Sequence, residues 1–163
     1  GVQTCALPIC RGDGDNTPED WLLVRAGKDR AGWLLESLME LIPPLEVARF
    51  REGQRIRAWF VLHTEKDAEG DHAWYLWATT PRLAANEHEF EEIRVFVWNP
   101  QASRYETSYR EKNLKGMLPI AVSHDGGEKG DSPAFSFENL NEQGERVRRN
   151  YFMNGRQVRF KRD

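Results

Sequence analysis

Apolar and polar residues alternate over short stretches along most of the chain, which is the pattern of half-buried β-strands. The alternation is clearest in residues 55–63, where Ile56, Ala58, Phe60 and Leu62 take every second position. Similar stretches, separated by turn-forming residues, cover 73–80, 93–98, 104–110, 117–122, 135–140, 146–153 and 157–161. Because such short turns join antiparallel neighbours, we predict an all-β fold, an antiparallel meander of about seven strands closed as a barrel or a sandwich.

A separate hairpin is predicted at the start of this pattern. The apolar runs 21–26 and 31–35 each contain a tryptophan, Trp21 and Trp33, and they flank the turn 27–30, which begins with Gly27. This arrangement predicts a tight hairpin that packs both indoles into one small core. The pair that starts at Pro43 ends the unit, because consecutive prolines cannot continue a helix. Helix is expected only as short turns, within residues 36–52 and 82–92.

The first residues have an unusual composition for a protein terminus. Residues 1–9, GVQTCALPI, equal the in-frame translation of a common short-read sequencing adaptor. We therefore interpret residues 1–10 as an artefact that takes no part in the fold, and expect the natural protein to begin upstream of Arg11. The alternative is a real N-terminus with a Cys5–Cys10 pair. Both cysteines of the chain lie in this stretch, so the rest is predicted to lack disulfides and thiolate metal sites. The expected domains are 11–43 and 45–163.

Composition narrows the classes of protein further. Hydrophobic residues make up 39% and charged residues 30% of the chain, as in soluble globular domains. The net charge of −3 is too small to indicate a nucleic-acid partner. No apolar run is long enough to cross a bilayer, so we predict no membrane-spanning segment.

Motifs for catalysis or metal binding are absent from the sequence. The histidines, at positions 63, 72, 88 and 124, have no HExxH-type spacing, and no GxSxG or glycine-rich phosphate loop occurs. Acidic turns within 67–71 and 125–131 could bind calcium weakly, but neither matches an EF-hand loop. We predict no catalytic residue, no metal and no cofactor. A pair of carboxylates joined by the fold, as in glycoside hydrolases, stays open because its spacing is three-dimensional.

Aromatic and arginine side chains supply the candidate binding site. Alternation places Trp59, Tyr75, Trp77, Phe96 and Trp98 on one face of the predicted sheet, together with Arg55, Arg57 and Arg94. An exposed row of this kind could stack on sugar rings or hold an extended peptide. The alternative is that the face is buried, since large aromatics usually supply core area. The candidate binding residues are Trp59, Trp77, Trp98, Arg57 and Arg94.

The hairpin also resembles a known family. Trp21-Leu22-Leu23-Val24-Arg25, Gly27, Gly32-Trp33-Leu34 and Leu38 follow the order of the late hairpin of bacterial Src-homology-3-like (SH3b) domains. The resemblance covers about residues 11–42, and the family's earlier strands have no counterpart in it. Residues 45–163 resemble the β region that follows such a domain in some bacterial proteins, through RVFVWN, RYETSYREKNLKG and LPI.

The resemblance implies a small β-barrel that binds cell-wall peptides or proteins in the cell envelope or outside the cell. We therefore expect a non-catalytic binding module of a secreted or cell-envelope protein, contacting peptidoglycan, peptide or protein. Two alternatives are a glycan-active enzyme with non-local carboxylates and a purely structural domain.

Overall fold

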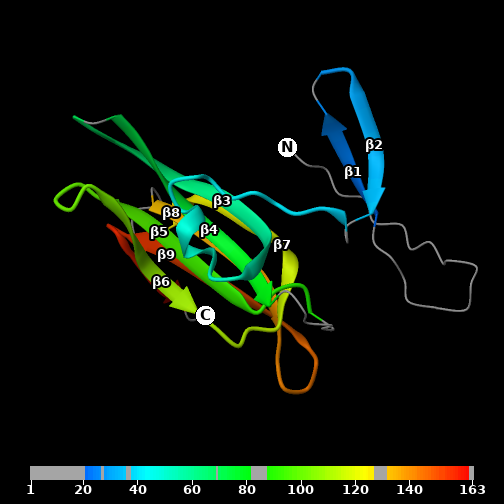
Figure 1. Cartoon of the computed structure of the whole chain (residues 1–163). Coiled ribbons are helices and arrows are strands. Elements are labelled where there is room, and N and C mark those ends of the chain that lie inside the picture. Colours follow the sequence, from blue (N-terminus) through cyan, green and yellow to red (C-terminus); the bar gives the residue numbers. More distant parts are fainter. Residues whose placement is uncertain are drawn as a thin grey trace, which may run out of the picture. The chain divides into compact units, whose positions relative to one another are not determined.

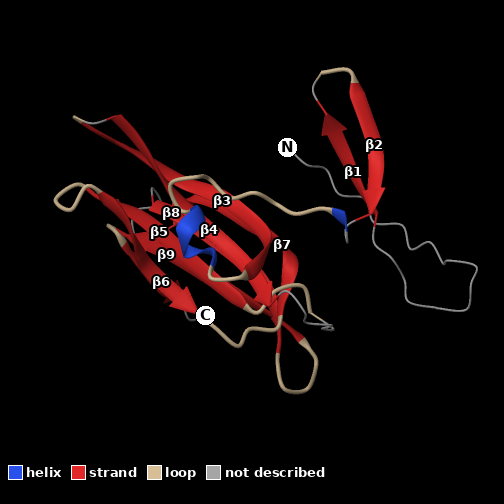
Figure 2. Cartoon of the chain, viewed as in Figure 1, coloured by secondary structure: helices blue, strands red, loops and turns tan. Residues whose placement is uncertain are grey.

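The computed structural model describes residues 21–26, 28–35, 38–68, 70–81, 88–126 and 132–161. The chain divides into two compact units, residues 1–41 and 42–163. Most described residues of both units lie in strands, and helix among them is limited to short turns (Figures 1 and 2). The predicted all-β class is therefore confirmed. The expectation for residues 1–10 lies outside the described residues.

The first unit contains the predicted hairpin. Strands β1 (Trp21–Ala26) and β2 (Arg30–Leu35) pair antiparallel, with Leu23 opposite Trp33. Trp21 lies opposite Leu35, so both indoles belong to the same face of the hairpin. Trp33 is nevertheless 42% exposed, so the predicted enclosure of both indoles in one core is not found. Two strands have too little surface to bury a side chain of this size.

The second unit contains two four-stranded antiparallel sheets. The first sheet has the order β3 (Gln54–Asp67), β4 (Gly70–Pro81), β5 (Glu92–Asn99) and β6 (Arg104–Glu111). The second has the order β10 (Gln157–Lys161), β9 (Arg146–Asn154), β8 (Ser132–Leu140) and β7 (Gly116–Gly126). Neighbours in each sheet are consecutive in the chain, which confirms the meander, with one strand more than predicted.

The two sheets pack face to face as a sandwich. One hydrophobic cluster joins side chains of both inner faces, such as Leu76 and Val95 of the first sheet and Phe135 and Tyr151 of the second. Both sheets are open. Of the two predicted arrangements, a barrel and a sandwich, the structure therefore has the sandwich. Each sheet consequently also has an outer face, directed away from this core.

A β-bulge in β3 changes the predicted side-chain pattern. The register shifts between Ile56 and Ala58, and Ile56 lies opposite Thr79 on the outer face, whereas Ala58 belongs to the inner face. The sequence pattern placed both on one face. Arg55, opposite Thr80, is likewise on the other side of the sheet from Trp59. The extra residue of a bulge inverts the sidedness of the strand before it, which explains both corrections.

Two hairpins are longer than predicted. Residues 64–71 were expected to form a charged turn, but β3 and β4 continue to Asp67 and Gly70. Residues 123–133 were expected to form a loop, but β7 reaches Gly126 and β8 begins at Ser132. Strands that project beyond the core tolerate polar side chains on both faces, so composition alone underestimates the length of such strands. Pro119 lies in β7, an edge strand of its sheet, where proline is tolerated.

Residues 43–53, the covering segment, lie on the outer face of the first sheet (Figure 2). They include the short 3₁₀ helix η2 (Ala48–Arg51), within the predicted helical region. Val47 is fully buried and Pro43 is buried, so the segment packs into the second unit. It ends with positive φ angles of 51° at Glu52 and 77° at Gly53, which turn the chain into β3.

The two sheets are linked by a close backbone approach at Gly116. Gly116 and Phe90 exchange two backbone hydrogen bonds, of 3.1 and 2.9 Å. A Cβ atom at Gly116 would lie 2.1 Å from the fully buried Phe90 ring, so this position requires glycine. Because Phe90 pairs with Gly116 and β5 begins at Glu92, the helical turn expected in 82–92 is not formed in its described part, 88–92.

Candidate functional site

The outer face of the first sheet brings together the aromatic residues that the sequence pattern places on one face. Trp59 lies opposite Trp77, Tyr75 opposite Phe96, and Trp98 opposite Tyr105. Ring centroids of Trp77 and Phe96 are 4.6 Å apart, and those of Trp98 and Tyr105 are 5.3 Å apart. The row is therefore continuous across the sheet. Tyr105 belongs to it but was not among the predicted residues.

Most of this aromatic row is buried. Trp77 is 1% exposed, Phe96 is fully buried and Trp98 is 9% exposed. The ring of Phe50, from the covering segment, lies 5.0 Å from that of Phe96. The row forms a second apolar core beneath the covering segment. Burial of this face was the alternative left open by the sequence, and the observed cover is a short stretch immediately before β3.

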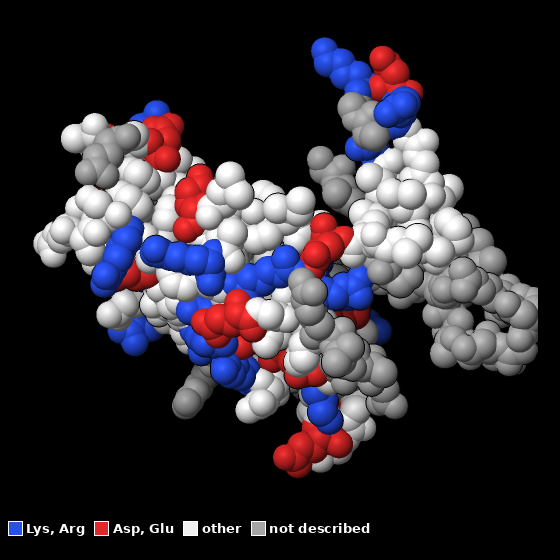
Figure 3. Space-filling model, in the orientation of Figure 1, with Lys and Arg blue, Asp and Glu red and all other residues white. Residues whose placement is uncertain are grey.

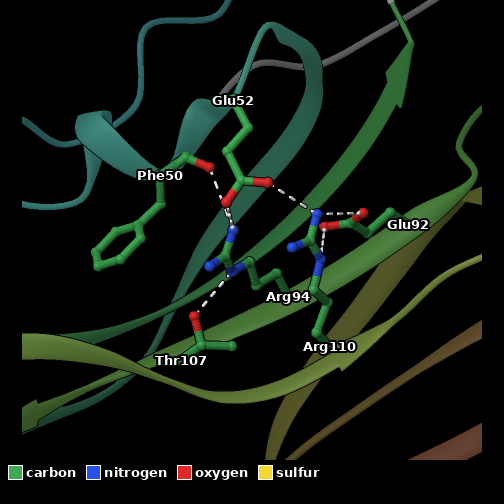
Figure 4. A network of polar contacts seen from close by, with 6 residues as sticks. All are labelled: Phe50, Glu52, Glu92, Arg94, Thr107 and Arg110. Atoms are coloured by element: carbon green, nitrogen blue, oxygen red, sulfur yellow. Dashed lines mark hydrogen bonds and ion pairs between the residues drawn. The ribbon is translucent and has the colours of Figure 1, made fainter.

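Arg94 fastens the covering segment to the sheet (Figure 4). Its side chain is 10% exposed, and Nη1 donates to a Glu52 carboxylate oxygen at 2.9 Å and to the Phe50 carbonyl at 3.3 Å. Its Nε donates to the Thr107 hydroxyl at 2.8 Å. The guanidinium also lies 5.1 Å from the centroids of the Phe50 and Phe96 rings. These contacts satisfy a cation that is costly to bury, so in this conformation Arg94 is a structural anchor.

A second arginine extends this network. Arg110 binds Glu92 through Nε at 2.8 Å and Glu52 through Nη2 at 3.1 Å. The hydrogen bond from Arg94, assisted by that from Arg110, holds the pKa of the Glu52 carboxyl below its ordinary value. The hydrogen bond that Arg110 donates to Glu92 raises the pKa of Arg110 above its ordinary value. Ion pairs and hydrogen bonds join Glu52, Glu92, Arg94 and Arg110 into one network, which suits a structural clamp better than an acid–base pair. Figure 3 shows other basic and acidic side chains similarly interleaved.

The tip of the β3–β4 hairpin covers Trp98. The His72 ring stacks on Trp98 with centroids 3.9 Å apart and an interplanar angle of 3°. Asp67 accepts a hydrogen bond from Trp98 Nε1 at 2.8 Å, and its other carboxylate oxygen lies 3.0 Å from His72 Nε2. Sequence analysis placed Asp67 in an acidic turn and gave His72 no specific structural role. Their role depends on the unexpectedly long hairpin, which brings its polar tip back onto the sheet.

Trp59 and Arg57 differ from the other candidate residues. Arg57 occupies the β-bulge and is half-buried. Trp59 is 37% exposed and packs edge-to-face against Tyr75, with ring centroids 6.3 Å apart. Val61, opposite Tyr75, is 45% exposed. Trp59 and Val61 together form a small apolar surface, the β3 rim, supported from below by Tyr75.

The described residues include a shallow cavity, but no group of side chains among them could hold a metal ion. A shallow cavity of about 280 Å³ is lined by His63, Trp74, His124, Ser132, Pro133, Met153 and Gly155. None of these described lining residues is a carboxylate, whereas glycoside hydrolysis requires two. Across the described residues, no three His, Cys, Asp or Glu side chains are grouped to hold a metal ion. No helix there has the length and apolar character needed to cross a membrane.

Comparisons with models of known protein families, with curated proteins and with solved structures find no match to this chain. The resemblance of residues 11–42 to SH3b domains therefore stays a prediction. What the chain does has to be argued from the geometry of its surfaces.

Proposed function

We propose that this chain is a non-catalytic binding module of a bacterial cell-envelope or secreted protein, contacting peptidoglycan, peptide or protein. The observation that carries the proposal is the β3 rim. Trp59 is the candidate aromatic that keeps a substantial exposed surface, at 37%, while Trp77 and Trp98 are enclosed. An exposed indole on a rigid sheet can stack on a sugar ring or pack against an apolar peptide side chain.

The geometry of the rim supports this role. Trp59 is held edge-to-face by Tyr75, so little side-chain freedom is lost when a ligand covers it. Val61 widens the apolar surface. The edge of β3 itself is less suited to pairing with an added strand, because its bulges after Ile56 and Val61 interrupt the ladder. We therefore assign contact to these side chains rather than to the strand backbone.

The assignment to the cell envelope rests on the resemblance of residues 11–42 to SH3b domains. A purely structural role is the second candidate, favoured by the burial of Trp77, Phe96 and Trp98. A glycan-active enzyme has less support, because Glu52 and Glu92 are both bound by arginines.

The test is a Trp59→Ala variant of the full chain, assayed for sedimentation with purified peptidoglycan. Leu45→Ala is the matched control, because Leu45 is 85% exposed and lies outside the rim. Loss of binding in the Trp59 variant at an unchanged melting temperature supports the proposal. Binding that is equal for both variants would contradict it, and a large fall in melting temperature would identify Trp59 as a core residue instead.

A further inference from the structure

The outer face of the second sheet carries an uneven charge. Strand register places Arg146 and Arg148 of β9 on this face. They lie opposite Leu140 and Glu138 of β8, and Leu140 and Glu138 alternate with the residues of β8 that face the core. Arg159 and Lys161 of β10 share the face, since they lie opposite Phe152 and Asn150. No register shift interrupts β8–β9 or β9–β10, so this sidedness is continuous. We call Arg146, Arg148, Arg159 and Lys161, together with Glu138, the cationic face.

This surface is positive on a chain that is negative as a whole. Four basic side chains and one carboxylate give the cationic face a net charge of +3, against −3 for the chain. All five side chains are exposed. A local excess of this kind attracts anionic ligands even when the whole molecule does not.

Three of the four cations lack a carboxylate partner among the described residues. Arg146 binds Glu138 at 3.1 Å. Arg148 donates instead to the Ser136 hydroxyl at 3.4 Å, and Arg159 donates to the Gln157 side-chain oxygen at 2.9 Å. Both keep further guanidinium donors for an external acceptor. Lys161, opposite Asn150, is exposed without an ion pair.

We propose that the cationic face binds an acidic polysaccharide through the carboxylate or phosphate groups of that polymer. Arginine forks suit such groups because they bind two oxygens at once. The neutral side chains between the cations include Asn150, Ser136 and Gln157, which can hydrogen-bond sugar hydroxyls. Phe152 and Leu140, two large apolar residues of this face, are both half-buried, so they offer little surface for insertion into a bilayer or for stacking on a nucleobase.

The inference does not depend on the β3 rim. Trp59 lies on the outer face of the first sheet, so the sandwich separates it from the cationic face. If one surface did not bind its proposed ligand, the proposal for the other surface would be unaffected. The two surfaces can therefore be tested independently in the same chain.

The experiment measures binding of the full chain to polygalacturonate at low salt. The test variant combines Arg148→Gln, Arg159→Gln and Lys161→Gln, and the control combines Lys66→Gln, Lys112→Gln and Lys115→Gln. Both remove three exposed positive charges, so overall charge is matched. We expect Kd to rise roughly tenfold or more in the test variant and less than about twofold in the control, with the salt dependence of log Kd reduced by about 2 in the test variant.

Other outcomes would overturn the proposal. An equal loss of binding in the control would show that net charge, rather than this face, is responsible. Equal binding to neutral dextran would exclude a role for the acidic groups. Tighter binding to vesicles of phosphatidylglycerol and phosphatidylcholine in equal parts, or to oligothymidylate, would assign the face to a membrane or to nucleic acid. Melting temperatures of both variants, expected to match that of the unmodified chain, verify that they are folded.

Discussion

Arg94 and Glu52 form an ion pair of 2.9 Å between residues 42 positions apart in the chain. The contact joins the covering segment to the centre of the first sheet. It explains why an aromatic row that could serve as a ligand platform is instead a core. The Phe50 carbonyl and ring bind the same guanidinium, so the segment is held by both polar and apolar contacts.

The first prediction concerns the pH dependence of this ion pair. Because Arg94 and Arg110 lower the pKa of Glu52 in the folded chain, the carboxylate stabilises the fold above its unfolded pKa, near 4.5. That contribution is lost as pH falls through the lower folded pKa. Glu52→Gln should therefore be less stable than the unmodified chain at about pH 7, and the difference should shrink near pH 3.

The expected size is below about 1 kcal/mol, since the Glu52 side chain is 48% exposed and solvent screens the pair. Urea unfolding at both pH values measures it. Glu138→Gln is the control, because its carboxylate is 47% exposed and binds a single arginine on the other sheet. A stability difference for Glu52→Gln that stays constant with pH would contradict the assigned role.

The second prediction separates the size of Trp77 from its polar atom. Trp77 is 1% exposed, and its Nε1 has no hydrogen-bond partner among the residues that the structure describes. Trp77→Ala should cost about 3–5 kcal/mol through lost burial and a cavity. Trp77→Phe keeps much of the apolar volume and removes the unpaired donor, so its cost should be less than half of that. Thermal or urea unfolding of both variants checks the order, and similar losses would show that the indole nitrogen is satisfied in solution.

The third prediction concerns the crossing between the sheets. Gly116→Ala places a Cβ atom 2.1 Å from the buried Phe90 ring, so the backbone or the ring must move. We expect a loss of about 1–3 kcal/mol or more in unfolding free energy. The control is Gly32→Ala, because a Cβ atom at Gly32 would meet nothing within 4 Å. Equal melting temperatures for Gly116→Ala and the unmodified chain would show that the ring adapts freely.

The strands could be predicted from sequence because their signal is local. Burial alternates with period two in the middle of β8, whereas β4 and β5 are buried on both faces over most of their length. The bulge at Arg57 could not be predicted, since Ile56 and Ala58 are both apolar and either face accepts them. The hairpin tip at Asp67 was missed for a related reason, because polar residues give no sign that a strand continues.

The sequence predicted which aromatic residues share one face of the sheet, but it did not predict how deeply that face is buried. The pattern identified which aromatics share a face, whereas burial depends on the covering segment, a contact between distant residues. One signal was present. Arg94 stands between Ile93 and Val95 in an otherwise apolar strand, and a cation so placed needs a carboxylate partner. The sequence contains many acidic residues, so the identity of Glu52 required the structure. The cationic face could be identified only from the strand pairing of β8, β9 and β10, which the sequence does not give.

A carboxylate between the two sheets provides the basis for the last prediction. Glu111 of β6 accepts hydrogen bonds from the hydroxyls of Tyr109, at 2.7 Å, and Tyr151, at 2.8 Å. Arg149 binds its other oxygen at 2.7 Å. Burial, followed by the interaction with Glu111, raises the pKa of Tyr109 to about 12 and raises that of Tyr151 further. Burial also raises the pKa of Tyr105 to about 12 and that of Tyr75 above its ordinary value.

The fourth prediction is that tyrosine ionisation and unfolding occur together. These four residues are all the tyrosines of the chain, and each has a raised pKa when folded. Their hydroxyls bind protons more tightly in the folded state, so stability should fall as pH rises above the unfolded value of about 10. Tyrosinate absorbance should therefore stay low at about pH 10 in the folded chain, and should appear with the loss of near-ultraviolet circular dichroism at higher pH. In urea the same tyrosines should titrate near pH 10, which is the control. Ionisation of most of them near pH 10 with the fold intact would show that the inner sheet surfaces and the covering segment are more open to solvent than this structure indicates.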